Sequence, residues 1–326
     1  MVRERAGAAS RKAQSAMEYL MTYGWAILII AVILGALFQL GVFNSNSFAP
    51  KAPPGACVVY RPYGPVDVRL VSLSGICNGE LPQYVGNFNN YPGPATQYIG
   101  VNLTAFQNQG STINELTASA WFAEDQLQTS NICAVGLMGQ MEGNGGGSAG
   151  VAQGWSFEAY RTCDNAPFIS FLAGNGVTQA NGGLYGIGTS SLEPDTWYFV
   201  TGTINGNVIS LYLNGQFVAN TVVTSGVANT QYPFSIGVYG WNGCLTCFDW
   251  WQGSIANIQL YNTSFSANEV QQLYVEGIGG APTRLQNLVG WWTLDGNAND
   301  YSGNGRNGTT KGLSYSSDWT SQYTPP

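Results

Sequence analysis

Two Asn-Gly pairs constrain the fold of this chain more than any other feature of its sequence. Asn205-Gly206 and Asn214-Gly215 each stand between alternating apolar runs in TWYFVTGTINGNVISLYLNGQFVANTVV, residues 196–223. Alternation with a period of two is typical of a strand with one buried face. Asn-Gly suits a type I′ turn, which needs positive φ at both central residues. We therefore predict three consecutive antiparallel strands in this stretch.

Further strand patterns flank this predicted meander. ELTASAWFAED alternates, which places Phe122 on one face and Trp121 on the other. FSIGVYGW and WWQGSIANIQLYN supply two more strands. The helical signal is confined to SANEVQQLYVEG, where Ser266 and Glu269 form a capping box and Gly277 ends the helix. The chain is therefore expected to be mainly β.

The order of these stretches resembles the laminin-G-like, concanavalin A-like jelly roll. TASAWF, the double hairpin, FSIGVYGW and WWQGSIANIQLYNTSFSANEVQQLY follow one another in the order and spacing of that family. The resemblance implies a β-sandwich domain over 84–280, of a fold that serves both lectins and glycan-cleaving enzymes.

The segment 281–326 departs from the family pattern. LVGWWTLDGNANDYSGNGRNGT, at 288–309, reads like the family's first strand, yet here it follows the helix. The strand could complete its own sandwich as a circular permutation, insert into the next subunit of a filament, or open a truncated second copy. We favour the first alternative, because a sandwich that lacks an inner strand exposes its core.

A long apolar run lies near the N-terminus. From Met17 to about Val42 the chain carries no charge after Glu18, and about 20 apolar residues suffice for a helix to cross a bilayer. We predict one long hydrophobic helix over 14–43. The basic residues that precede it favour a cytoplasmic N-terminus and an external C-terminal domain, as in a single-pass protein of the cell membrane.

The start of this run resembles archaeal class III signal peptides and the type IV pilins that carry them. The resemblance rests on the basic leader, the Lys12-Ala13-Gln14 junction and the acid Glu18. It implies that a prepilin peptidase removes residues 1–13 and that Glu18 faces the new N-terminal amine of a neighbouring subunit. Membrane lipid, the peptidase and other pilin-like subunits are the implied partners, in a surface filament. The alternative is a plain signal anchor.

Two small segments connect the helix to the sandwich. Residues 44–56 are polar and Pro-rich, as in an extended stalk. Residues 57–83 show short β-like runs, and we expect a small β element closed by a disulfide. Sequence proximity suggests three pairs, although the connectivity stays open: Cys57 with Cys77, Cys133 with Cys163, and Cys244 with Cys247.

Three N-x-[ST] sequons occur in the predicted external part, at Asn102, Asn262 and Asn307. Each fits N-glycosylation of an exported chain, although such short motifs also arise by chance in sequence rich in Asn and Thr.

Composition and charge exclude several classes of function. The net charge is −7 and histidine is absent. An acidic chain lacks the basic patch that nucleic acid requires, and a Ser-His-Asp triad cannot form. The close acid pairs Glu124-Asp125 and Glu193-x-Asp195 lack the spacing of a glycosidase pair on one strand, so we interpret them as turn and rim charges. We therefore predict a protein that is not an enzyme.

DGNANDYSGNG, at 295–305, gathers oxygen ligands that suit a hard cation. Asp295, Asn297, Asn299 and Asp300 could bind Ca²⁺ together with backbone carbonyls. The alternative is that these residues simply form turns. Calcium is the one cofactor that the sequence suggests.

Aromatic residues around the loop that contains Cys244 and Cys247 offer a ligand site. Tyr239, Trp241 and Trp250 could stack on a sugar or anchor a protein. We predict a surface-anchored, pilin-like protein whose sandwich serves adhesion or the recognition of extracellular carbohydrate or protein. The alternatives are a membrane-tethered binding module without a filament and, ranked last, a glycan-cleaving enzyme.

Overall fold

The computed structural model describes residues 21, 23–35, 58–60, 72–74, 81–89, 97–103, 111–125, 134–142, 151–160, 168–177, 183–238, 251–320 and 323–326. The chain divides into two compact units, residues 1–56 and 57–326. Each is described by itself.

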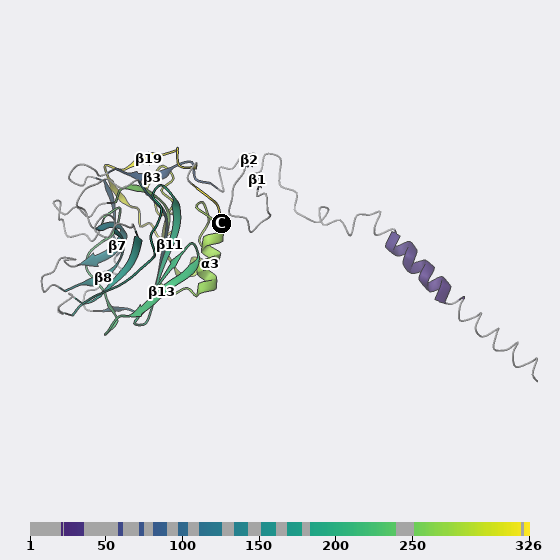
Figure 1. Ribbon diagram of the computed structural model, residues 1–326, viewed down its shortest axis with the longest axis horizontal. Helices are drawn as coiled ribbons and strands as arrows, with labels where there is room; N and C mark the ends of the chain where they lie inside the picture. Colours follow the sequence, from purple (N-terminus) through teal and green to yellow (C-terminus); the bar gives the residue numbers. More distant parts are fainter. Residues whose placement is uncertain are drawn as a thin grey trace, which may run out of the picture. The chain divides into compact units, whose positions relative to one another are not determined.

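The second unit is a sandwich of two antiparallel sheets, as predicted (Figure 1). One sheet has seven strands, in the order β10 (Leu184–Gly188), β9 (Phe168–Asn175), β8 (Gln153–Tyr160), β7 (Ala134–Glu142), β15 (Phe234–Ile236), β4 (Tyr98–Val101) and β18 (Thr309–Lys311). The other has eight: β13 (Gln216–Val222), β12 (Val208–Leu213), β11 (Trp197–Asn205), β6 (Glu115–Glu124), β16 (Gly253–Tyr261), β3 (Val85–Phe88) and β19 (Ser314–Ser316), with β17 (Leu288–Trp292) also on β16. Two short pairs complete the described strands: β1 (Val58–Tyr60) with β2 (Ser72–Ser74), and β5 (Thr112–Ile113) with β14 (Val227–Ala228).

The predicted three-strand meander is confirmed as β11, β12 and β13. In the second hairpin, Asn214 and Gly215 have φ of 49° and 75°, as a type I′ turn requires. The prediction for the first hairpin was wrong by one residue. Asn205 pairs with Val208, so Gly206 and Asn207 are the central residues, and only Gly206 has positive φ. Glycine at the first central position suits a type II′ turn.

The alternation of β6 divides its side chains between two cores. Phe122 faces the other sheet and belongs to the main core of the sandwich, together with Trp155, Phe157 and Trp292. Trp121 faces outward into a second buried layer. Both faces of β6 are therefore buried, one between the sheets and one outside the eight-stranded sheet.

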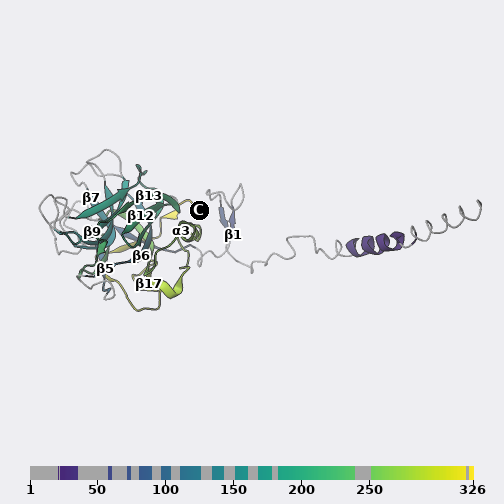
Figure 2. The same ribbon diagram turned by 90° about the horizontal axis from the view of Figure 1, so that it is seen from below.

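The helix α3 (Ala267–Val275) helps to form this outer layer (Figures 1 and 2). Its buried side chains are Val270 and Leu273. The predicted helix start is confirmed: the Glu269 carboxylate accepts hydrogen bonds from the backbone N–H and the hydroxyl of Ser266, both at 2.8 Å. Gly277, at φ 78°, follows the helix end as predicted.

The C-terminal segment returns to the same sandwich. After the short 3₁₀ helix η2 (Leu285–Asn287), β17 pairs with β16 and fully buries Trp292. β18 then pairs with β4, and β19 with β3. The last residues cover the outer layer, where Trp319 and Tyr323 are buried against the eight-stranded sheet. The Tyr323 hydroxyl accepts the Ile278 N–H at 3.0 Å.

In the first unit, residues 21 and 23–35 are helical. Each of their large apolar side chains is at least half exposed, from Met21 to Leu34. Among the described residues, none of the helices has the length and apolar character needed to cross a membrane. The remaining parts of the predicted 14–43 helix, and the stalk at 44–56, lie outside the described residues.

Candidate functional site: an acidic recess where β6 ends and β11 begins

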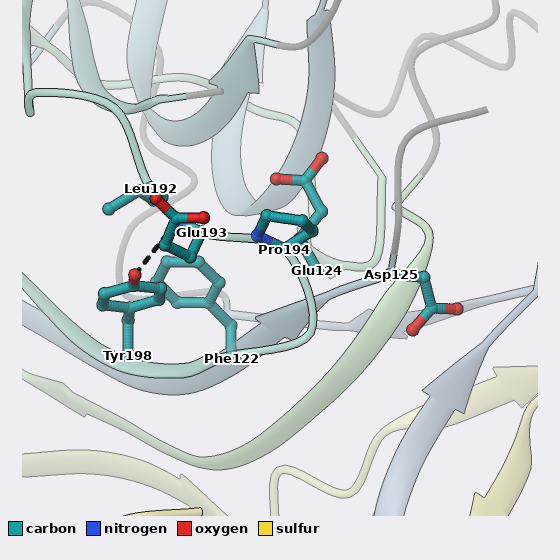
Figure 3. Close-up of a pocket in the computed structure, with 7 residues that line it drawn as sticks. All are labelled: Phe122, Glu124, Asp125, Leu192, Glu193, Pro194 and Tyr198. Carbon is teal, nitrogen blue, oxygen red and sulfur yellow. Dashed lines mark hydrogen bonds between the residues drawn. The ribbon is translucent and has the colours of Figure 1, made fainter. Parts of the chain in front are cut away.

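A shallow recess brings Glu193 close to the acid pair Glu124-Asp125. β6 and β11 are antiparallel, and Ala123 pairs with Trp197. The end of β6 therefore lies beside the loop that enters β11. Phe122, Glu124, Asp125, Leu192, Glu193, Pro194 and Tyr198 line this recess (Figure 3).

Backbone hydrogen bonds hold the recess in place. The Asp195 N–H donates to the carbonyl of Glu124 at 2.7 Å, and the Asp125 N–H donates to the carbonyl of Gln252 at 3.3 Å. The Glu193 N–H donates to the hydroxyl of Tyr198 at 3.0 Å (Figure 3). Asp195 has a φ of 53°, which Asp tolerates better than most residues and which turns the loop back toward β6.

The recess combines an apolar floor with an acidic rim. Phe122 and Leu192 are buried, and the ring of Tyr198, partly exposed, lies 5.9 Å from that of Phe122. Glu193 is exposed to solvent, whereas Glu124 is buried, with only 5% of its surface exposed. The carboxylates of Glu124 and Asp125 point in opposite directions, as expected for neighbours on a strand (Figure 3). The carboxylate oxygens of the rim can accept hydrogen bonds from hydroxyl groups. The aromatic rings of the floor can pack against a flat apolar group.

Gly237 and Trp251, described residues on either side of segment 239–250, lie near the recess floor. The Phe122 ring packs edge to face against the Trp251 ring, with the ring centroids 5.6 Å apart. The backbone N–H of Trp251 donates to the carbonyl of Gly237 at 3.1 Å. The chain thus leaves for segment 239–250, and re-enters from it, beside the recess floor. The predicted ligand residues Tyr239, Trp241 and Trp250 lie in that segment, outside the described residues, and their role stays a prediction.

The prediction of turn and rim charges fits the structure, because Glu193 is exposed and Asp195 lies in the turn before β11, but the sequence did not place the two acid pairs side by side. They approach one another because of a pairing between strands about 70 residues apart in the chain. A usable signal was present in the sequence. Had the TASAWFAED and TWYFVTG stretches been aligned as antiparallel neighbours, Glu124-Asp125 would have fallen beside Glu193-x-Asp195.

The predicted calcium ligands form a tightly hydrogen-bonded loop. One oxygen of the Asp300 carboxylate accepts the N–H groups of Trp291 and Ser302, and the other accepts that of Arg306, at 2.9 to 3.0 Å. Asp295 accepts the Tyr84 N–H at 2.7 Å. The Asn297 side chain accepts the Asn299 N–H at 2.9 Å.

These bonds fit the turn-forming alternative, and calcium binding stays a prediction. Within the described part of the chain, no group of three or more Asp, Glu, Cys or His side chains is placed to hold a metal ion.

The remaining predicted sites divide into described and undescribed residues. All three sequon residues, Asn102, Asn262 and Asn307, are exposed. The processing residues Ala13, Gln14 and Glu18 lie outside the described residues, as do the six cysteines, Cys57, Cys77, Cys133, Cys163, Cys244 and Cys247.

Several solved structures resemble this chain at low sequence identity. A Bacteroides ovatus structure, described as that of a candidate carbohydrate binding protein, shares 19% identity at a TM-score of 0.49, over 72% of this chain and 60% of that one. The heptameric SAP-like pentraxin of Limulus polyphemus shares 12% identity at a TM-score of 0.41, over 59% of this chain and 80% of the pentraxin chain. The CBM40 of a Ruminococcus gnavus sialidase, bound to sialyllactose, shares 17% identity at a TM-score of 0.38, over 56% of this chain and 95% of the CBM40 chain. Likeness at this level carries no conclusion about ligand or activity.

No curated protein matches the chain. A family model, however, matches residues 95–271, which is more than half of the sequence. The matched range begins just before β4, ends within α3 and includes the whole recess. The chain belongs to the concanavalin A-like lectin/glucanase superfamily.

Proposed function

We propose that this protein binds extracellular carbohydrate and that the acidic recess takes the sugar. The observation that carries the proposal is a shallow recess in which the exposed Glu193 lies beside the ring of Tyr198 and the buried Phe122. The superfamily to which the chain belongs includes lectins.

Sugars present two kinds of surface to a protein. Their hydroxyl groups donate hydrogen bonds, which ionised carboxylates accept strongly. Their C–H faces rest on aromatic and apolar side chains. The recess supplies both, since Glu193 is exposed at the rim and Tyr198 lies over the buried Phe122.

We propose binding without cleavage. A glycosidase needs one carboxyl that donates a proton and a second that attacks or activates water across the same bond. Adjacent Glu124 and Asp125 point apart and cannot flank one bond in this way (Figure 3). Glycan cleavage is the second candidate, because Glu124 and Glu193 do share the recess.

A glycan array probed with the full chain in a mild neutral detergent tests the proposal. We expect Glu193→Gln and Tyr198→Ala to weaken binding to the preferred glycan by about tenfold, as loss of one charge-assisted hydrogen bond or one aromatic contact does. The matched control is Glu115→Gln, because exposed Glu115 begins β6 about 30 Å from Glu124.

Equal affinity of the wild type and both recess variants would place the sugar elsewhere. Mass spectrometry of the array glycans after incubation separates the two candidates. Shortened glycans would overturn binding without cleavage.

We further propose that the N-terminal helix keeps the domain at the cell surface, in the pilin-like manner implied by Ala13, Gln14 and Glu18. The exposed apolar side chains of residues 23–35 support a non-aqueous environment for this segment. Mass spectrometry of the protein isolated from its native membrane is expected to find a chain that starts at Gln14. A chain that starts beyond Phe43 would contradict surface anchoring by this helix, and an uncleaved chain would favour a plain signal anchor.

A further inference from the structure

The part of the chain that forms the recess is strongly acidic. From residue 70 to residue 283 the sequence contains twelve Asp and Glu residues but only one cation, Arg161. Three of these acids line the recess. A fourth, Asp195, lies beside it, because its N–H donates to the carbonyl of Glu124 at 2.7 Å. A ligand that enters the recess therefore meets a concentration of negative charge.

The cations of the described residues are Arg284, Arg306 and Lys311, all within the last 43 residues, and each makes its contacts away from the recess. Arg284 forms an ion pair with Glu269 of α3. Arg306 donates to a backbone carbonyl of β17. The Lys311 ammonium lies 5.7 Å from the centroid of the Tyr98 ring. None of the three lines the recess, so the described part of the chain supplies no cation that neutralises its rim.

Glu193 is the charge that a ligand in the recess reaches most directly. Its side chain is exposed, and its N–H donates to the Tyr198 hydroxyl at 3.0 Å, which holds the residue beside that ring. An ammonium group on a sugar can donate a charge-assisted hydrogen bond to the Glu193 carboxylate while the sugar ring rests on Tyr198. A carboxylate on the sugar would meet a like charge at the same place, which is unfavourable.

We infer that the recess selects glycans by charge. It binds oligosaccharides of amino sugars whose nitrogen is unacetylated, binds the N-acetylated forms more weakly, and rejects acidic sugars. The inference rests on the proposed function, because it takes the recess as the place where the glycan binds. Acetylation removes the positive charge of the amine but leaves the sugar ring unchanged, so a comparison of the two forms isolates the contribution of charge to specificity.

Isothermal titration calorimetry of the full chain in neutral detergent tests this selectivity with four oligosaccharides of equal length, built from glucosamine, galactosamine, N-acetylglucosamine or galacturonic acid. We expect at least one of the two amino-sugar chains to bind about tenfold more tightly than the acetylated chain, because only the charged amine gains the charge-assisted hydrogen bond. The galacturonic acid chain should show no binding. The preference for the amine should shrink in about 1 M salt, where the Debye length is about 3 Å.

Variants of Glu193 locate the selectivity. Glu193→Gln keeps the shape of the side chain but removes its charge, and should lower the ratio of the two affinities, amine over acetylated, by at least about fivefold. Glu193→Lys should lower this ratio further and allow the galacturonic acid chain to bind. The matched control is Glu115→Gln, at the other end of β6, which removes the same unit of net charge and should leave the ratio unchanged.

The possible outcomes separate this inference from the proposed function. Equal affinity for the amine and acetylated chains, or wild-type binding of the galacturonic acid chain, would overturn the inference. If Tyr198→Ala still weakened binding in that case, the recess would remain the sugar site, without selectivity for charge. A preference that Glu193→Gln and Glu115→Gln reduce equally would also overturn the inference. Binding that Tyr198→Ala and Glu193→Gln both leave unchanged, or no binding of any of the four chains, would count against both.

Discussion

At the scale of single residues, Asp300 is the clearest case of a side chain that organises a loop. Its carboxylate accepts three backbone N–H groups. We expect Asp300→Ala to lower the free energy of unfolding by about 2–3 kcal/mol, because it leaves partly buried N–H groups without a charged acceptor. Urea denaturation at pH 7 measures this loss. Asp318→Asn, at an exposed position, is the control and should change stability by less than about 0.5 kcal/mol.

The same carboxylate gives stability a defined pH dependence. Burial raises the pKa of Asp300, but the hydrogen bonds from Ser302, Trp291 and Arg306 lower it more, so the net pKa lies below its ordinary value. Its contribution is therefore complete above the pKa of the unfolded chain, about 4, and is lost as the pH falls through the folded pKa. The stability of Asp300→Ala should fall less steeply below about pH 4 than that of the wild type. Identical acid profiles would contradict this account.

At the scale of elements, the two hairpin turns form a natural pair of variants. Gly206 and Gly215 both have positive φ, but a Cβ at Gly206 would meet nothing within 4 Å. A Cβ at Gly215 would meet the Gln271 Oε1 at 2.5 Å and the Tyr274 Cβ at 3.0 Å, both on α3. Gly206→Ala should cost about 1 kcal/mol from backbone strain alone.

Gly215→Ala should cost about 2–3 kcal/mol, because the Gln271 side chain must also turn away and Tyr274 must move slightly. Thermal and urea unfolding of the two variants side by side measure the difference. Equal costs would mean that α3 does not pack firmly on the β12–β13 turn.

At the scale of the whole molecule, the last 39 residues are part of the sandwich. They contribute β17 to the eight-stranded sheet and place Trp292 in the main core. A chain that ends at Asn287 should fail to give a protease-resistant domain, since its core would be exposed. Co-expression of residues 281–326 as a separate chain should restore resistance. A truncated chain that resists protease without the added segment would show that the sandwich does not need this strand.

Local patterns in the sequence predicted most strands but not the recess. The hairpins, the Ser266 capping box and the division of Phe122 and Trp121 between two faces depend on neighbours a few residues apart. The predicted position of the first turn was wrong by one residue because Asn205-Gly206-Asn207 contains both an Asn-Gly and a Gly-Asn pair. Both pairs suit two-residue hairpin turns.

The sequence by itself determined a β-sandwich with an apolar N-terminal run, because alternation, turn residues and apolar length act through adjacent parts of the chain. Only the tertiary structure decided that Glu124 and Glu193 share one recess and that β17 returns to β16. Both facts depend on contacts between distant segments. Such contacts form only when two sheets bury a common core, and no local pattern specifies which strands then become neighbours.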